Sequence, residues 1–313
     1  MISHKKNQSI RFLSLALIIL SFGGFHYGCS TVSEGDATSD HMIMNPMKQE
    51  LESKATASTP IITAVPVPSG FKLILTGTGV SVYKKDYPGG QPDFVTVVDL
   101  RKGSLINLTG TVQDVPKDPN DKIWKKSFND FWSDAKAKET ATRKARVVVN
   151  GTFFSQNDNP TPIAFGLKVG GKVISYGYGL NEFSGLIRTL SFDVSAAKAM
   201  IDPYEKLTFN GTITDVIGAL DPAANKQASS WLPRTFVGVR DDDNNGTVET
   251  VIFFSSKYAR QKWASDILTS FGASKKAMLD GGTSTGLMID GNSRSYITPG
   301  RTIPHAIAIY SGK

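Results

Sequence analysis

Residues 71–254 contain a series of short apolar runs that have the length and residue types of β-strands. Glycine and asparagine separate many of them, as the turns of a strand-rich domain require. The runs cover residues 71–75, 80–83, 94–100, 145–149, 163–169, 172–176, 186–194, 235–240 and 248–254. So many short strands leave room for few helices, and they predict a domain built mainly from β-sheet.

Two segments have apolar residues at helical spacing instead, and we expect both stripes to face the core. The stripes are Trp124, Phe128, Phe131 and Ala135 in the first segment, and Tyr258, Trp263, Ile267 and Phe271 in the second. The second helix should follow Ser255-Ser256 and end at Gly272. The sequence therefore predicts an α+β fold: a strand-rich mixed sheet with two or three helices in a single domain.

The N-terminus resembles a secretory signal, which we assign to residues 1–29. Lys5, Lys6 and Arg11 precede an apolar core at residues 12–20. That core is too short to span a bilayer comfortably. Cys29 follows it, in a position that resembles a bacterial lipoprotein cleavage site, and we expect it to carry the lipid. His26 and Tyr27 depart from the usual Leu and small residue, so ordinary signal cleavage is the alternative.

Cys29 is also the only cysteine of the chain. The mature protein can therefore form no intrachain disulfide, thiol nucleophile or cysteine-based metal site, although we expect it to be exported. Residues 30–69 are rich in Ser, Thr, Ala and Pro without an apolar period, which predicts a flexible tether. The folded domain should then cover residues 70–313, and its stability must come from the size of its core.

Composition and charge exclude several classes of protein. With 40% hydrophobic and 20% charged residues, the chain is neither disordered throughout nor a polytopic membrane protein. The net charge of +7 is concentrated in the signal and in residues 115–146. An excess so localised argues against a nucleic-acid-binding fold. A solvated helix face explains it, and a weak contact with an anion is the alternative.

Four motifs that could carry chemistry lie at the ends of apolar runs. The first is Asn150-Gly151-Thr152, the second Arg234-Thr235, the third Asp280-Gly281-Gly282-Thr283-Ser284, and the fourth Arg301 with His305. Taken singly, each also has a structural interpretation. An Asn-Gly step is a favoured hairpin turn, Arg234 could be a solvated strand-end residue, and an acid such as Asp280 can cap a turn. A lone histidine is more often structural than functional.

Taken together, in this order and spacing, the motifs resemble those of the phosphodiester glycosidase family. That family shows an Asn-Gly-Gly-Phe-Phe-like motif, an Arg-Thr-Ala-like strand, a Leu-Asp-Gly-Gly-Gly-Ser loop and a final arginine-led strand. The matching residues here are 150–154, 234–235, 279–285 and Arg301, within a region of roughly residues 147–310. Thr152 and Thr283 depart from the pattern, because each replaces a smaller residue that the family commonly has there.

The resemblance implies a site for a sugar 1-phosphodiester. Ordinary glycosidases need two carboxylates because the departing alkoxide must be protonated. A phosphate leaving group is stable as an anion, so cations can replace much of the general acid. The implied roles are Asp280 as acid/base or nucleophile, Arg234, Arg301 and His305 at the phosphate, Asn150, Thr152 and Ser284 at the sugar, and Gly151, Gly281 and Gly282 where ligand approaches backbone.

No second carboxylate belongs to these motifs. Glu182, Asp193 and Asp290 are the first candidates should Asp280 prove structural. Residues 241–246 partly fit a calcium loop, but its twelfth position is Ile252 where a bidentate Glu is needed, so we expect a hairpin turn. We expect neither a metal nor a cofactor.

The sequence thus predicts an exported, lipid-anchored glycosidase of the periplasm or cell envelope. Its substrate would be a glycan or sugar phosphate, with N-acetylglucosamine the sugar that the resemblance suggests, and it would contact the membrane through Cys29 but bind no nucleic acid. Two alternatives remain: a non-catalytic envelope glycan-binding lipoprotein, and a structural lipoprotein in which the motif residues are only turns.

Overall fold

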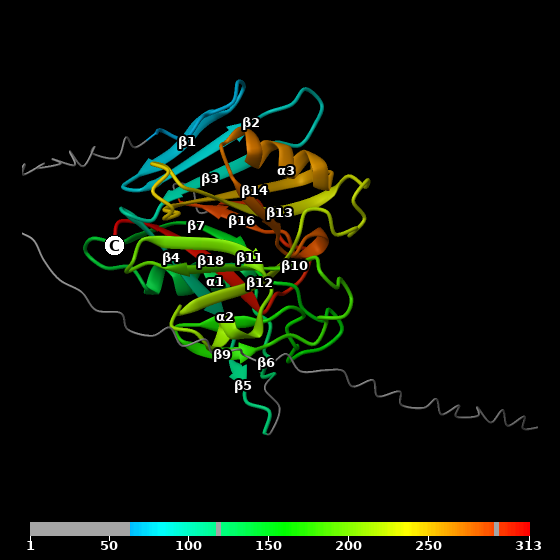
Figure 1. Ribbon diagram of the computed structural model, residues 1–313. Coiled ribbons are helices and arrows are strands. Elements are labelled where there is room, and N and C mark those ends of the chain that lie inside the picture. The colour runs from blue at the N-terminus through cyan, green and yellow to red at the C-terminus, as the bar shows by residue number, and fades with distance from the viewer. Residues whose placement is uncertain (1–62, 117–119, 291–293) are drawn as a thin grey trace, which may run out of the picture. The chain divides into compact units, whose positions relative to one another are not determined.

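The computed structural model of the protein describes residues 63–116, 120–290 and 294–313. The proposed signal, Cys29 and most of the proposed tether lie outside the described residues. Within the described part of the chain, no helix is both long and apolar enough to cross a bilayer. Two sheets make up most of the domain (Figure 1).

The larger sheet has eleven strands, and its main path runs β1-β2-β3-β14-β13-β15-β12-β10-β11. Two further strands, β8 and β9, extend from β12. The strands, in chain order, are β1 (Lys72–Gly77), β2 (Val80–Lys85), β3 (Asp93–Asp99), β8 (Leu167–Val169), β9 (Lys172–Ser175), β10 (Ile187–Asp193), β11 (Lys198–Pro203), β12 (Asp215–Leu220), β13 (Leu232–Arg240), β14 (Thr250–Ala259) and β15 (Lys275–Met278).

The smaller sheet has the order β17-β16-β7-β18-β4, and β5 pairs only with β6. The bounds are β4 (Gly103–Thr109), β5 (Val112–Gln113), β6 (Lys122–Ile123), β7 (Lys144–Asn150), β16 (Leu287–Ile289), β17 (Arg294–Ile297) and β18 (His305–Ser311). Every pairing among the described strands is antiparallel, whereas the sequence suggested a mixed sheet. The strand-rich α+β class is confirmed.

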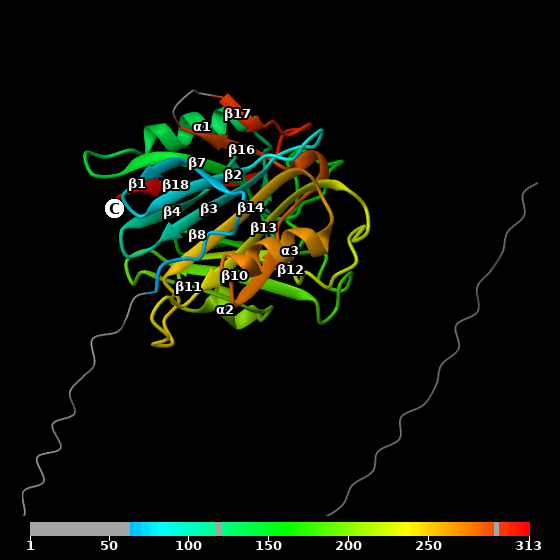
Figure 2. The same ribbon diagram turned by 90° about the horizontal axis from the view of Figure 1, so that it is seen from above.

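In the part of the chain that the structure describes, three α-helices accompany the sheets: α1 (Phe128–Ala137), α2 (Lys206–Asn210) and α3 (Gln261–Ser270). In Figure 2, α1 and α3 lie on opposite sides of the two sheets. The middle of the larger sheet is buried on both faces. In β14, for example, Val251 and Phe253 belong to one core cluster, while Ile252 and Phe254 belong to the other, which packs against α3. This is the alternation that a strand imposes on its side chains.

The two predicted helical stripes are only partly buried. Phe128, Phe131 and Ala135 of α1 are buried as expected, and Ser127 starts the helix with a capping box. Trp124 precedes the helix and is exposed. In the second stripe, Phe271 is buried but Trp263 is 38% exposed and Tyr258 is 53% exposed. Tyr258 is part of β14 rather than of α3, and α3 buries Gln261, Ala264 and Leu268 instead.

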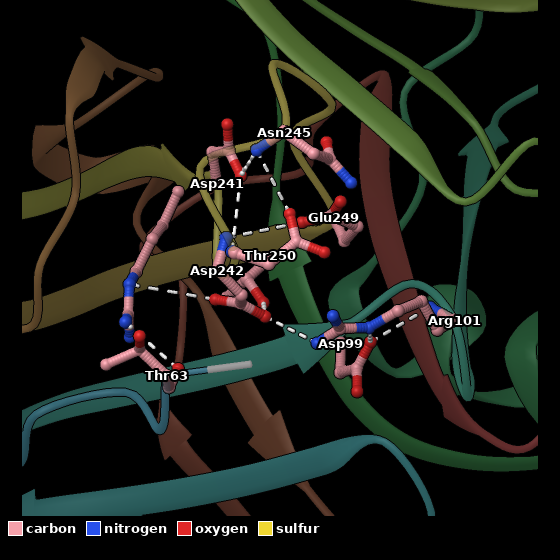
Figure 3. A network of polar contacts seen from close by, with 10 residues as sticks. Thr63, Asp99, Arg101, Asp241, Asp242, Asn245, Glu249 and Thr250 are labelled. Carbon is pink, nitrogen blue, oxygen red and sulfur yellow. Dashed lines mark hydrogen bonds and ion pairs between the residues drawn. The ribbon is translucent and has the colours of Figure 1, made fainter. Parts of the chain in front are cut away.

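A polar network joins the β13–β14 hairpin to two other segments (Figure 3). Arg101, in the turn between β3 and β4, pairs with Asp99 and with Asp242 of the hairpin. Thr63 donates its N–H to the Asp242 carbonyl at 2.9 Å, and its own carbonyl accepts from Arg240 at 3.0 Å. The end of the segment proposed as a tether is thereby bonded to the domain.

The expected hairpin turn at residues 241–246 is confirmed, since this segment joins β13 to β14. Backbone N–H groups of Asp243, Asn245 and Gly246 donate to the carboxylate of Asp241. Oxygens of Asp241, Asp243 and Glu249 lie within 4.8 Å of one another. Asp241 and Asp243 are half-buried and Glu249 is buried, and a group of acids does not by itself make a cation site.

Candidate active site

Segments from all four sequence motifs meet around one cavity of about 280 Å³. Asp280, Gly281 and Gly282 line it after β15, Arg234 lines it from β13, and Arg301 from the segment before β18. Asp280, Arg234 and Arg301 thus lie around one cavity although they are far apart in the sequence. The first motif lies directly behind the cavity, because the Asn150 side chain donates to the Asp280 carbonyl at 2.7 Å.

The ends of the two sheets are joined at this point. The N–H of Asp280 donates to the carbonyl of Gly151 at 3.0 Å, and that of Leu279 donates to the carbonyl of Thr235 at 3.0 Å. After Asp280 the chain turns through Gly282, whose φ of +59° is the left-handed conformation that favours glycine. Backbone bonds from both sheets thus fix the position of the Asp280 carboxylate.

Asp280 is buried, with 8% of its surface exposed. Burial raises its pKa to about 6, because the ionised form is poorly solvated; hydrogen bonds from Ser284 and the Gly281 N–H and the charge of Arg301 oppose the shift without cancelling it. Burial outweighs the charge of Arg301, so the carboxyl group exchanges its proton near pH 6.

Arg301 is the cation that faces this carboxyl group. Its Nη2 lies 3.4 Å from Oδ2 of Asp280. Its Nε donates to Oγ of Ser284 at 2.7 Å, its Nη1 donates to Oε1 of Gln156 at 2.9 Å, and the guanidinium lies 4.8 Å from the centre of the Phe154 ring. These contacts hold a positive charge at the cavity wall, where a substrate phosphate could meet it.

Arg234 makes a different set of contacts. Its guanidinium donates to the backbone carbonyls of Ala259, Lys226, Gln227 and Ser230, so four of its five N–H groups are engaged. Arg234 is buried, and desolvation lowers the pKa of its guanidinium without removing the charge. A direct contact with phosphate, the role that the resemblance implied for Arg234, is not available in this arrangement. The side chain instead holds the segment 226–230 against the cavity.

The polar atoms of Asn150, Thr152 and His305 bond within the protein. Asn150 Oδ1 accepts from Thr235 Oγ1 and from the N–H of Gly286. Thr152 donates its hydroxyl to the Gly218 carbonyl and its N–H to Nδ1 of His305. These buried side chains support the loop between β7 and β8 and do not line the cavity.

His305 packs behind Gly151. A Cβ at position 151 would lie 1.9 Å from Nδ1 of His305, so only glycine fits there. Because Nδ1 accepts from Thr152, the proton lies on Nε2, which donates to Asn107 Oδ1 at 3.1 Å. Burial lowers the pKa of His305 to about 3, which keeps the ring neutral. A neutral, fully bonded ring is not the phosphate-binding cation that the sequence suggested.

The sequence did not identify a second carboxylate for the site, and it named Glu182, Asp193 and Asp290 as candidates. Asp290 pairs with Arg146, and Asp193 accepts hydrogen bonds from Ser195. Only Glu182 contacts a residue that lines the cavity, since its Oε1 lies 3.2 Å from Nζ of Lys226. Among the described residues that line the cavity, Asp280 is the sole acid.

Sequence reasoning missed several residues of the cavity. Gln156, Phe153 and Lys226 line it, and Gln156 also orients Arg301. Lys226 lies in a polar segment without an apolar period, and no motif marked it. Phe153 and Phe154, in contrast, belong to the matched motif. The sequence therefore contained a signal that these two rings contact the site.

A larger cavity of about 760 Å³ lies between α3 and strands β10 and β11. Four of its five charged residues are in ion pairs, Arg188 with Asp221, Lys275 with Asp202 and Lys262 with Asp266, and the fifth, Lys276, donates to the hydroxyl of Thr269. None of the four sequence motifs lines it, and we therefore place the candidate chemistry at the smaller cavity around Asp280.

The cavity combines a buried carboxyl group, which exchanges its proton near pH 6, with a fixed cation, an arrangement that is suited to acid–base chemistry. The sequence model of the phosphodiester glycosidases matches residues 143–310, a span that contains every motif described above. The chain belongs to this family, which is one of glycosidase-type hydrolases.

Two solved structures resemble the fold. A hypothetical protein from Synechocystis is 14% identical with a TM-score of 0.46, over 78% of this chain and 69% of that protein. The catalytic domain of zebrafish N-acetylglucosamine-1-phosphodiester alpha-N-acetylglucosaminidase, auto-inhibited by its pro-peptide, is 14% identical with a TM-score of 0.47, over 79% of this chain and 86% of that domain. A comparison with curated proteins gave no match.

Proposed function

We propose that the protein hydrolyses the bond between a sugar and a phosphate, with N-acetylglucosamine as the first sugar to test. The observation that carries this proposal is the Asp280 carboxyl group, held buried at a cavity wall with a pKa of about 6 and opposite a fixed arginine. Family membership supports the same class of substrate.

The geometry suits a reaction in which one carboxyl group is sufficient. Water adds to the anomeric carbon while the bond from that carbon to the phosphate oxygen breaks, and the electron pair leaves with the phosphate. That anion needs little protonation, so a cation can stabilise it where an ordinary glycosidase uses a second acid. Arg301 supplies the cation, and the remaining proton passes from water to Asp280 acting as general base.

Asp280 could act instead as a nucleophile that forms a glycosyl ester, which water then hydrolyses. Both routes need an ionised carboxylate. With a pKa of about 6, Asp280 is mostly ionised at neutral pH yet basic enough to accept a proton. The role of Arg301 is the same in both routes.

The proposal is tested by incubating the purified protein with N-acetylglucosamine 1-phosphodiesters of simple alcohols and with an uncharged aryl N-acetylglucosaminide. We expect release of free sugar from the phosphodiesters and much slower release from the uncharged compound, because only the former offers an anion to Arg301. Absence of turnover on a panel of sugar 1-phosphodiesters would favour the alternative, a non-catalytic glycan-binding protein.

We also propose that the protein is exported and held in the cell envelope by a lipid on Cys29. The proposal comes from the sequence alone: a basic segment, a short apolar core, and then the only cysteine of the chain. An anchor at Cys29 would keep the hydrolase domain close to envelope glycans, at a distance set by the length of residues 30–69.

Cys29→Ala should release the protein from the membrane fraction, because Cys29 is the one residue to which a thioether-linked lipid can attach. Fractionation of bacterial cells that express either form measures this. We expect wild type in the membrane pellet and the variant in the soluble fraction or with an unprocessed signal. Wild type found wholly in the soluble fraction excludes the anchor.

A further inference from the structure

A second pocket, of about 220 Å³, lies outside the candidate active site and is walled by aromatic side chains. We refer to it as the aromatic pocket. Its rings come from Tyr87 after β2, Trp231 before β13, Tyr258 in β14 and Trp263 in α3. Its volume is below the roughly 300–1,000 Å³ of pockets for drug-sized ligands, so it suits a single ring.

The rings are exposed and ordered with respect to one another. Trp231 and Trp263 are each 38% exposed, and Tyr258 is 53% exposed. Trp231 and Tyr258 are nearly parallel, with an interplanar angle of 13° and ring centres 5.1 Å apart. Tyr87 meets Trp263 edge to face at 6.0 Å. Such a concentration of exposed aromatic area is costly in water unless a ligand covers it.

A buried carboxylate fixes two of these rings. Asp93 Oδ2 accepts from the Tyr87 hydroxyl at 2.7 Å and from Nε1 of Trp263 at 2.9 Å. The polar ends of both rings therefore point inward, and their apolar surfaces are left to form the pocket wall. A site whose side chains are already held in position loses little freedom when a ligand binds.

The aromatic pocket and the cavity around Asp280 are both lined by the segment that leads into β13. Trp231 lines the first and Leu232, the next residue, lines the second. Arg234 bonds to the carbonyls of Gln227 and Ser230, which fixes the segment that separates the two. Both cavities thus depend on one segment held in place by Arg234, and a glycan of several rings is the kind of ligand that could extend from one to the other.

We propose that the aromatic pocket binds a pyranose ring of the same glycan whose phosphodiester lies at Asp280. A pyranose offers a face of C–H groups to an aromatic ring while its hydroxyl groups remain in water, which fits rings that are apolar and half exposed. A cationic ligand is disfavoured, because Arg260 and Lys85 already lie 5.1 and 5.4 Å from the rings of Trp231 and Tyr87. The choice of a sugar rests on the proposed function.

The test measures binding rather than turnover, by calorimetric titration of the purified protein with chitotriose, cellotriose and maltotriose. We expect at least one trisaccharide to bind. Tyr258→Ala should weaken that binding about 5- to 30-fold, the factor that corresponds to roughly 1–2 kcal/mol. Tyr258 is half exposed, so its removal leaves the core intact.

Trp124→Ala is the matched control, since Trp124 is 44% exposed but lines neither cavity. Its affinity should equal that of wild type. Absence of binding by all three trisaccharides, or equal binding by Tyr258→Ala and wild type, would overturn the proposal. Binding of tetramethylammonium in place of the sugars would also overturn it. Failure to cleave any phosphodiester affects the proposed function alone, because no step of this titration depends on hydrolysis.

Discussion

Replacing Asp280 by asparagine should lower the turnover of a sugar 1-phosphodiester about 10²- to 10⁴-fold if the residue is a general base, and further if it is a nucleophile. Asparagine preserves the size of the side chain but can neither accept the proton nor attack carbon. The measurement is kcat and kcat/KM for wild type and Asp280→Asn on the substrate that the screen identifies. Near-normal turnover by the variant would make Asp280 structural, and Glu182 would then be the first candidate base.

The pH dependence should identify the same group. Because the pKa of Asp280 is about 6, kcat/KM of wild type should fall as the pH drops below 6 and the carboxylate is protonated. The residual activity of Asp280→Asn should lack this acid limb.

The free energy of unfolding provides the control for this variant. Its contribution from Asp280 falls as the pH rises, whereas activity should increase. Folding raises the pKa of Asp280 from 3.8 to about 6, so its contribution to the free energy of unfolding is complete below pH 3.8 and is lost as the pH rises through 6. Above pH 6 the ionised group costs the folded state about 3 kcal/mol. Asp280→Asn should therefore be as stable as wild type in acid and more stable at neutral pH. An inactive but more stable variant cannot be explained by misfolding.

The strands that could be predicted from the sequence are those marked by an apolar run or alternation within a single segment. Apolar runs of four or more residues, such as those that became β3, β10 and β14, were found because their burial depends on a run or an alternation within one segment. The three-residue β16 was missed, since it is too short to show a period. Sheet order and the antiparallel pairing of β13 with β15 depend on residues far apart in the chain, which no local pattern records.

Trp263 shows that apolar spacing alone also cannot locate the boundary between a strand and a helix. Its helical stripe was extended back through Tyr258, but Tyr258 belongs to a strand, and the helix that begins at Gln261 buries a different face. The spacing of apolar residues alone could not show where the strand ended. Tyr258 and Trp263, which the sequence placed on a buried helical face, are two of the four rings that wall the aromatic pocket.

At the candidate site, the sequence located the motifs but not the direction of their side chains. Asp280 and Arg301 face the cavity as expected. Asn150 and His305 instead bond to partners more than a hundred residues away, Asp280 and Asn107. A side chain that supports a catalytic loop and one that contacts substrate occur in the same motif, and only their hydrogen-bond partners distinguish them.

Arg234→Lys should lower the free energy of unfolding by about 2–4 kcal/mol, because a lysine ammonium cannot reach the four carbonyls that the guanidinium satisfies, and each buried carbonyl left without a donor costs about 1–3 kcal/mol. Urea unfolding of wild type and variant measures the loss. Activity should fall as well, since the segment 226–230 that Arg234 holds forms part of the cavity wall.

Arg301→Lys is the matched comparison for Arg234→Lys. Its side chain is 25% exposed and contacts Asp280, Ser284 and Gln156, so the substitution should change the free energy of unfolding by less than about 1 kcal/mol. It should still impair phosphodiester hydrolysis, because an ammonium lacks the forked geometry that grips two phosphate oxygens. The opposite result, a stable Arg234→Lys that loses affinity for phosphodiesters but not for uncharged glycosides, would show that Arg234 contacts the phosphate directly. In that case the segment 226–230 must move when substrate binds, because three of the guanidinium's bonds are to its carbonyls.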